Sequence, residues 1–304
     1  MSSFLQFTLG GVTNGFIYVL LALGWVIVYR VSGIVNIAQG NLLVLGGLTA
    51  VTLQAHSWPV WLAMLAGVLA AGATGGLFDI VILRRARTND VIALIVMTLG
   101  AAILAEELFD VIFGVNPLIM QSFLPTQPWT IGGVAIQPID VLVWGVAIVA
   151  LLALTLFFET TITGKALEAC AQSTEGATLM GISAKRMRVI AFTVGGLISG
   201  LGGVLLCTLV PMSFSDGILL GAKGLTVAIL ANWSYRYVVV AGVFVGLGEA
   251  YAVGYIASQW EDIVSMGLLV AVLLFRATNV SLRSFLLARR ERRTPLAAQP
   301  VEVG

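Results

Sequence analysis

Long apolar runs follow one another along almost the whole chain, and they decide what it can fold into. About nine of them are long enough, or nearly so, to be membrane spans. They cover residues 7–29, 33–54, 59–83, 91–114, 139–158, 189–210, 225–233, 238–257 and 263–280. Charged residues are only 10% of the 304 residues, too few to coat a water-soluble surface. The sequence predicts an all-α, polytopic transmembrane helical bundle of about eight or nine spans, some broken or re-entrant.

Two of these spans are irregular. Residues 33–41 (GIVNIAQGN) put glycines and amides at the start of the second span. This pattern predicts a local helix break there, or amides that bind neighbouring helices. Residues 225–233 are too short to cross a bilayer alone. That helix is therefore expected to be broken, to re-enter, or to begin near Leu219.

Lys and Arg are distributed unevenly between the loops. They gather at 30, 84–87, 165, 185–188, 236 and 283–293, whereas the loops 55–58, 115–138 and 258–262 have none. Positive residues favour the cytoplasmic side, so about nine crossings predict an outside N-terminus and a cytoplasmic C-terminus. Lys223 is the one exception to this alternation. Residues 283–304 are expected to form a basic, disordered cytoplasmic tail.

The segment Glu159–Arg188 is the longest polar stretch with helix-forming character between two spans. Its pattern predicts two short helices, at 166–174 and 177–180. Gly164 is expected to end the preceding span, Gly176 to separate the two helices and Gly181 to cap the second. Ser183 is expected to cap the next helix. Such a segment is either an ordinary amphipathic loop or a docking surface for a cytoplasmic partner.

Several segments of the chain resemble one known family. The sequence GKALEACAQSTEGATLMGISAKRMRVIAF (164–192) resembles the cytoplasmic loop of permeases of bacterial ABC importers for branched-chain amino acids. Residues 14–47, 221–233, 242–250 and 262–276 are similar to other parts of that family, in the same order. Length and N-terminus are similar to the shorter of its two permease types. Gln39 replaces a usual histidine, Ser173 a frequent acidic residue, and residues 230–235 (LANWSY) a glycine-rich run.

The resemblance implies a permease subunit of an ATP-driven importer in the bacterial inner membrane. Residues 1–282 would be its transmembrane domain, with 159–188 as the cytoplasmic coupling loop and 115–138 as an extracytoplasmic loop. Two cytoplasmic ATP-binding subunits, a second homologous permease subunit and an extracytoplasmic solute-binding protein would be its partners. The contact with the ATPase would involve Lys165, Ala166, Glu168, Ala169, Glu175 and Gly181. The chain has no G-x-x-x-x-G-K-[ST] motif, so ATP would be hydrolysed by other chains.

Polar side chains inside the spans are candidates for a translocation path. They are Asn14, Asn36, Gln39, Asn41, Glu106 and Glu249. Amides and carboxylates in a bilayer need partners, so each is equally interpretable as a hydrogen bond between helices. Asp79 is expected to pair with Arg84 or Arg85. The small-x-x-x-small faces at 196–200, 199–203 and 242–246 are expected to pack helices, within the chain or at a permease dimer interface.

Other functions are compatible with the sequence. Broken spans and buried carboxylates also suit an ion-coupled secondary transporter. A membrane scaffold without a solute path is another alternative, as is a permease of the same family for urea, amides or short carboxylic acids. One histidine (His56) and two distant cysteines provide no metal-binding or catalytic constellation. We expect no cofactor and no nucleic-acid partner.

Overall fold

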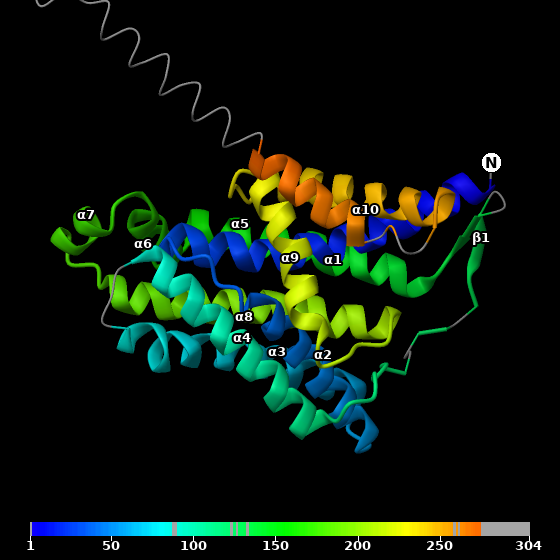
Figure 1. Cartoon of the computed structure of the whole chain (residues 1–304), viewed down its shortest axis with the longest axis horizontal. Coiled ribbons are helices and arrows are strands. Elements are labelled where there is room, and N and C mark those ends of the chain that lie inside the picture. The colour runs from blue at the N-terminus through cyan, green and yellow to red at the C-terminus, as the bar shows by residue number, and fades with distance from the viewer. Residues whose placement is uncertain are drawn as a thin grey trace, which may run out of the picture.

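The computed structural model describes residues 2–86, 90–121, 124–125, 127–131, 134–257, 260 and 262–274. These residues form the predicted all-α polytopic bundle, in which most of the long helices run side by side (Figure 1). The long helices are α1 (Ser2–Ser32), α3 (Val60–Val81), α4 (Val91–Phe113), α5 (Pro138–Thr160), α8 (Ala184–Leu209) and α10 (Val238–Tyr255). The shorter elements are α2 (Gln39–Ala55), η1 (Leu83–Arg85), α6 (Ile162–Gln172), α7 (Thr174–Leu179), α9 (Asp216–Leu230) and a helix at Asp262–Leu274.

Six helices in the described part of the chain are long and apolar enough to cross a membrane, namely α1, α3, α4, α5, α8 and α10. The other three predicted spans correspond to the shorter helices α2, α9 and Asp262–Leu274. A helix of 15 residues such as α9 is about 22 Å long, less than the hydrocarbon core of about 30 Å. Six of the nine apolar runs thus form full-length helices and two form the short helices α2 and α9, whereas the last run continues past Leu274, where the described residues end.

The centre of the bundle is built from α1 and α8. In α1 the most apolar stretch of 18 residues is 83% buried, and the corresponding stretch of α8 is 67% buried. The corresponding stretch of α4 is only 17% buried. Glycines let these helices approach their neighbours closely. A Cβ at Gly246 of α10 would lie 2.2 Å from the carbonyl oxygen of Gly11 in α1, and one at Gly196 of α8 would lie 2.5 Å from that of Ala71 in α3. The small-x-x-x-small faces therefore pack helices within this chain, where their glycines are buried.

The predicted break at the second span is confirmed. Gly33 ends α1 with φ +68°, and helix α2 begins only at Gln39. The residues between them run into the bundle without helical hydrogen bonds. Thr98 of α4 binds this backbone from both sides: it accepts from the N–H of Ile37 at 3.2 Å and donates to the carbonyl of Val35 at 3.4 Å. A neighbouring helix thus satisfies the groups that the break leaves open.

The short helix α9 begins earlier than the apolar pattern 225–233 indicates. It starts at Asp216 and crosses the long helices steeply in the view of Figure 1. Two carboxylates mark its beginning. Asp216 accepts a hydrogen bond from the N–H of Ser213 (2.7 Å), and Glu106 of α4 accepts from the N–H of Ile218 (3.2 Å). Acidic groups are favourable at a helix N-terminus, which explains a start in a polar segment.

The two ends of the bundle differ. One end carries a hairpin of the antiparallel strands β1 (Trp129–Ile131) and β2 (Val134–Ile136). Residues 132–133 between the strands lie outside the described residues, as does the 283–304 tail. Gln6 near the N-terminus donates to the carbonyl of Ala135 at 3.3 Å, so α1 starts at the hairpin end. Helices α6 and α7 lie at the opposite end (Figure 1).

Candidate functional site

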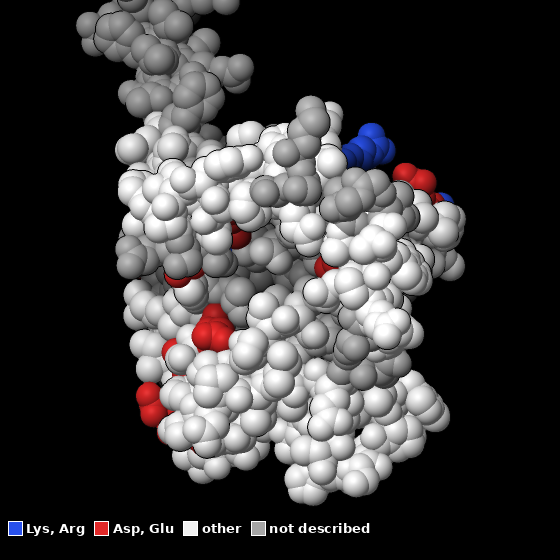
Figure 2. Space-filling model, turned by 90° about the vertical axis from the view of Figure 1, so that its right-hand side faces the viewer, with Lys and Arg blue, Asp and Glu red and all other residues white. Residues whose placement is uncertain are grey.

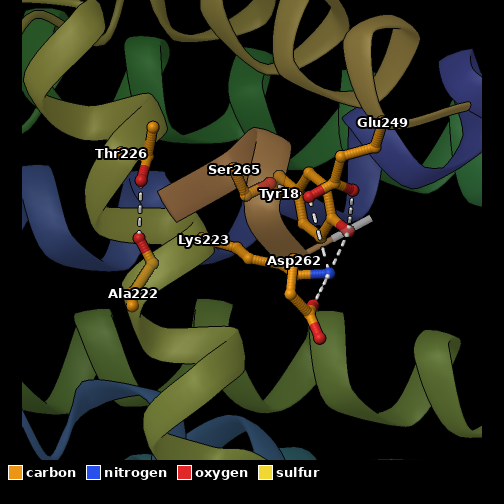
Figure 3. A network of polar contacts seen from close by, with 7 residues as sticks. All are labelled: Tyr18, Ala222, Lys223, Thr226, Glu249, Asp262 and Ser265. Atoms are coloured by element: carbon orange, nitrogen blue, oxygen red, sulfur yellow. Dashed lines mark hydrogen bonds and ion pairs between the residues drawn. The ribbon is translucent and has the colours of Figure 1, made fainter. Parts of the chain in front are cut away.

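A cluster of buried charged groups joins α1, α9, α10 and the 262–274 helix. Lys223 of α9 is 3% exposed and Glu249 of α10 is 1% exposed. The Lys223 Nζ lies 3.4 Å from Glu249 Oε1 and 3.0 Å from Asp262 Oδ1 (Figure 3). Tyr18 of α1 donates to Glu249 Oε2 at 2.5 Å, and the Ser265 hydroxyl donates to Glu249 Oε1. The Glu249 carboxylate is thus bound on both oxygens, as a buried ion requires.

A cavity of about 260 Å³ lies beside this cluster. A volume of about 10–15 Å³ is enough for one water molecule, so the cavity has room for a small solute. Its polar lining comes from Asn14, Tyr18, Asp216, Lys223 and Asp262. Its apolar lining includes Ile17, Leu206, Val210, Met212, Leu219 and Leu220. The cavity therefore offers charged groups and an apolar wall together.

The end of the bundle that carries the hairpin is hollowed. Figure 2 looks onto this end and shows Asp and Glu around the hollow, with Lys and Arg confined to one edge. The opposite end holds several basic residues. Arg30 pairs with Glu168 there at 3.8 Å, and Arg84 donates to the carbonyl of Lys185 at 3.3 Å. The charge asymmetry of the loops is thus also an asymmetry between the two ends of the fold.

Three of the six predicted path residues lie at or near the cavity. Asn14 lines it, Glu249 pairs with its Lys223, and Glu106 binds the N-terminus of α9 next to Asp216, which lines it. The sequence prediction missed Lys223 as a site residue. A signal was present, because Lys223 is the only basic residue that breaks the alternation between loops. A lysine within an apolar helix indicates a buried partner.

The other three predicted path residues are amides that bind neighbouring helices or one another. Gln39 donates to the Gly195 carbonyl at 3.1 Å and to the Ser199 hydroxyl at 2.8 Å. Asn36 donates to Gln39 at 3.3 Å, and Asn41 donates to the Ala102 carbonyl at 2.6 Å. None of these amides lines the 260 Å³ cavity. They join the start of α2 to α8 and α4, which is the role of hydrogen bonds between helices.

The prediction that Asp79 pairs with Arg84 or Arg85 was wrong. Asp79 is fully buried on α3 and its Oδ1 lies 2.5 Å from Arg188 Nε at the start of α8. Arg84, one of the two residues expected to pair with it, instead binds the Lys185 carbonyl. The close packing of α3 on α8 brings Arg188 nearer than the arginines next to Asp79 in sequence.

The loop Glu159–Arg188 folds into the two predicted short helices, but its breaks lie elsewhere than expected. Thr161 ends α5 and caps α6, accepting from the N–H of Gly164 at 2.9 Å. Ser173 separates α6 from α7 and caps α7, accepting from the N–H of Gly176 at 3.1 Å. Gly164 and Gly176 therefore lie inside the first turns. Hydroxyl side chains satisfy the free N–H groups of a first turn, which places the breaks at Thr161 and Ser173.

The predicted cap at Gly181 is confirmed. Gly181 has φ +81°, its N–H donates to the Thr178 carbonyl, and the N–H of Ile182 donates to the Ala177 carbonyl. These two bonds form a Schellman motif. Ser183 occupies the N-cap position of α8 as predicted, but its side chain makes no capping hydrogen bond.

The loop helices bury one face and expose another. Leu167, Cys170 and Ala177 are buried against the bundle. Burial raises the pKa of the Cys170 thiol. Of the predicted coupling residues, Lys165, Glu175 and Gly181 are exposed, and Ala166, Glu168 and Ala169 are half-buried. Two large apolar side chains that the sequence prediction did not select, Leu179 and Met180, are 89% and 82% exposed. Exposed apolar groups on a fixed scaffold are typical of a protein–protein contact.

A bundle of membrane-length helices with a buried charged cavity defines a polytopic membrane permease. The family described as "Branched-chain amino acid transport system / permease component" matches residues 7–273. The chain belongs to this family.

Relatives of named function match nearly the whole chain. The chain is 28% identical to the high-affinity branched-chain amino acid transport system permease protein LivH of Escherichia coli (strain K12), over 91% of this chain and 95% of that protein. It is 27% identical to the corresponding protein BraD of Pseudomonas aeruginosa, over 91% and 95%. The guanosine ABC transporter permease protein NupQ of Bacillus subtilis is 26% identical, over 83% and 84%. Family and fold agree with the sequence prediction.

Proposed function

We propose that this chain is one transmembrane subunit of an ATP-driven importer for branched-chain or closely related amino acids. Its partners are two cytoplasmic ATP-binding subunits, a second permease subunit and an extracytoplasmic solute-binding protein. The family, and the branched-chain amino acid transport for which LivH and BraD are named, support this solute class. The observation that carries the proposal is the α6–α7 surface with its exposed Leu179 and Met180.

The α6–α7 surface is suited to transmit a push. Its inner face is fixed by the buried Leu167 and Ala177, and Glu168 pairs with Arg30 of α1. Beyond the Schellman cap the chain continues directly into α8, whose Arg188 pairs with Asp79 of α3. A displacement of α6–α7 by an ATP-binding subunit is therefore transmitted to α1, α8 and α3, which are packed in the bundle. Coupling in this proposal means that a displacement of α6–α7 changes the positions of these helices.

In this proposal the end with α6 and α7 is cytoplasmic and the hairpin end is outside, in the bacterial inner membrane. The basic residues Arg30, Arg84 and Lys185 at the α6–α7 end support this orientation. A His56→Cys variant should be labelled by a membrane-impermeant maleimide in intact spheroplasts. A Ser173→Cys variant should be labelled only after lysis. The reverse pattern would rule out the orientation.

The coupling surface is tested with the complete importer in proteoliposomes. Leu179→Ser with Met180→Ser removes the exposed apolar groups, and we expect ATP-dependent leucine uptake to fall while the protein still assembles in the membrane. Val115→Ser is the control, because Val115 is also an exposed apolar residue but follows α4 and lies outside α6 and α7. Uptake and ATP hydrolysis by the double variant that equal those of the control would refute the role of α7.

The energy source separates this proposal from an ion-coupled transporter. Uptake should continue after an uncoupler collapses the ion gradients and should stop when the ATP-binding subunits are inactivated. Uptake that follows the ion gradient would overturn the proposal.

A further inference from the structure

Two carboxylates in the described part of the chain, Glu249 and Asp262, pair with Lys223 and have different environments. Glu249 is 1% exposed and is also held by Tyr18 and Ser265. Asp262 lies 3.0 Å from Lys223, and its side chain is 53% exposed at the edge of the cavity. Figure 3 shows Lys223 between the two, with Asp262 on the side away from Glu249. Asp262 is therefore the partner that an incoming ligand can displace without opening the buried part of the network.

A ligand that enters between Lys223 and Asp262 meets one charged group of each sign. An anion alone would bind Lys223 and leave Asp262 without its cation, whereas a cation alone would bind Asp262 and gain nothing from Lys223, which keeps Glu249 as its partner. A zwitterion contacts both groups, so it uses more of the charged lining of the cavity than a ligand of one sign does.

From this geometry we infer that the cavity binds an amino acid as a zwitterion. Its α-carboxylate contacts Lys223, its α-ammonium contacts Asp262, and its aliphatic side chain lies against Ile17, Leu206 and Leu220. The inference rests on the proposed function and specifies how the subunit itself holds the solute of that importer. Glu249 acts as a positioning residue, because it pairs with Lys223 and is itself held by Tyr18 and Ser265.

The test is protection of a cysteine in the cavity wall. A Leu220→Cys variant is assembled into the importer without the solute-binding protein, and its alkylation by N-ethylmaleimide is followed by peptide-resolved mass spectrometry. Leucine should slow alkylation roughly tenfold at a concentration about ten times its dissociation constant. At the same concentration, 3-methylbutylamine, which lacks the carboxylate, and 4-methylpentanoate, which lacks the ammonium, should each protect less than leucine does. Leu219→Cys, at a cavity residue that is 40% exposed, replaces Leu220→Cys if alkylation there is too slow to measure.

A second variant reverses the expected ligand preference. Asp262→Asn keeps the Lys223–Glu249 pair and removes only the proposed partner of the ammonium. In this background 4-methylpentanoate should protect and leucine should protect less than before. A Lys223→Gln/Glu249→Gln variant removes both buried charges together, and protection by every one of these ligands should be lost. The exposed His56→Cys variant controls for direct effects of the ligands on the reagent.

The outcomes separate this inference from the proposed function. If the complete importer transports leucine but leucine gives no protection, or if the two singly charged analogues protect the Leu220→Cys importer as well as leucine does, the zwitterion site is refuted and the importer proposal stands. An unchanged order of ligands in Asp262→Asn also refutes the site. Failure of the complete importer to transport leucine refutes the solute class, and the site with it.

Discussion

Arg188 Nε lies 2.5 Å from Oδ1 of the fully buried Asp79, and this pair joins the start of α8 to α3. Arg188 lies near the start of α8, the helix that follows α7 in sequence, and its side chain is 26% exposed. Asp79 has no exposure to solvent. The pair therefore connects the loop that we assign to coupling with a helix of the central bundle.

Removing one member of this pair should destabilise the protein strongly. We expect Asp79→Asn to lower the free energy of unfolding by about 3 kcal/mol, the lower end of the range for a broken buried pair because Arg188 is partly exposed. The double variant Asp79→Asn/Arg188→Gln should recover much of this loss. Denaturant titrations in mixed micelles measure the cycle. Purely additive effects of the two substitutions would contradict the pairing.

Capping of α7 by Ser173 gives a local prediction. Ser173→Ala should destabilise α7 by about 1 kcal/mol, and Ser173→Asp should preserve the cap, because either oxygen accepts from the first-turn N–H groups. Hydrogen exchange of the amides in residues 174–179 measures this. Ser183→Ala is the control, since the Ser183 side chain makes no cap bond. Equal exchange in the Ser173→Ala variant and the native protein would show that the cap contributes nothing.

The conformation of Gly181 can be tested without changing a contact. Nothing lies within 4 Å of a Cβ placed there, but its φ is +81°. Gly181→Ala should therefore cost about 1–2 kcal/mol through backbone strain alone. Gly100 also has open space around a Cβ but lies inside α4. Gly100→Ala should be neutral or stabilising, because alanine is the better helix former. Thermal unfolding of the two variants in detergent should shift in opposite directions, or only Gly181→Ala should shift.

Burial of Cys170 predicts a shifted pH dependence of its alkylation. Burial disfavours the thiolate, so the folded-state pKa is raised. At any pH below that pKa less thiolate is present than in an exposed cysteine, and alkylation is slower. The pH–rate profile of Cys170 should therefore rise at higher pH than that of the His56→Cys variant. A midpoint at or below that of the exposed thiol would be incompatible with the buried position.

Patterns along the sequence were sufficient for features set by local chemistry. The apolar runs predicted the bundle, the glycines and amides of 33–41 predicted the break before α2, and Gly181 was recognised as a helix cap. Two local details were missed. Thr161 and Ser173, not Gly164 and Gly176, mark the breaks of the loop, because hydroxyl caps compete successfully with glycine at helix N-termini.

Partners that depend on packing could not be predicted. Asp79 binds Arg188 of another helix in place of an arginine close in sequence. Lys223 meets Glu249 and Asp262 only because α9 lies across the bundle against α1 and α10. Hydropathy identifies which residues are costly to bury, but it carries no information on which helices become neighbours. The bonds of Asn36, Gln39 and Asn41 to one another, to α8 and to α4 likewise depend on which helices become neighbours.

The contact of α1 with α10 has a consequence for how the chain is made. Helix α1 is synthesised before α10, yet its glycines Gly11 and Gly15 pack on Gly242 and Gly246 of that much later helix. Until then α1 must be stable with lipid in place of its final neighbours. The most apolar stretch of α1 meets that need, because its mean hydropathy is 1.9 and it has no charged residue. In the finished fold 83% of this stretch is buried. Its composition thus suits the time before α10 arrives as well as the folded state.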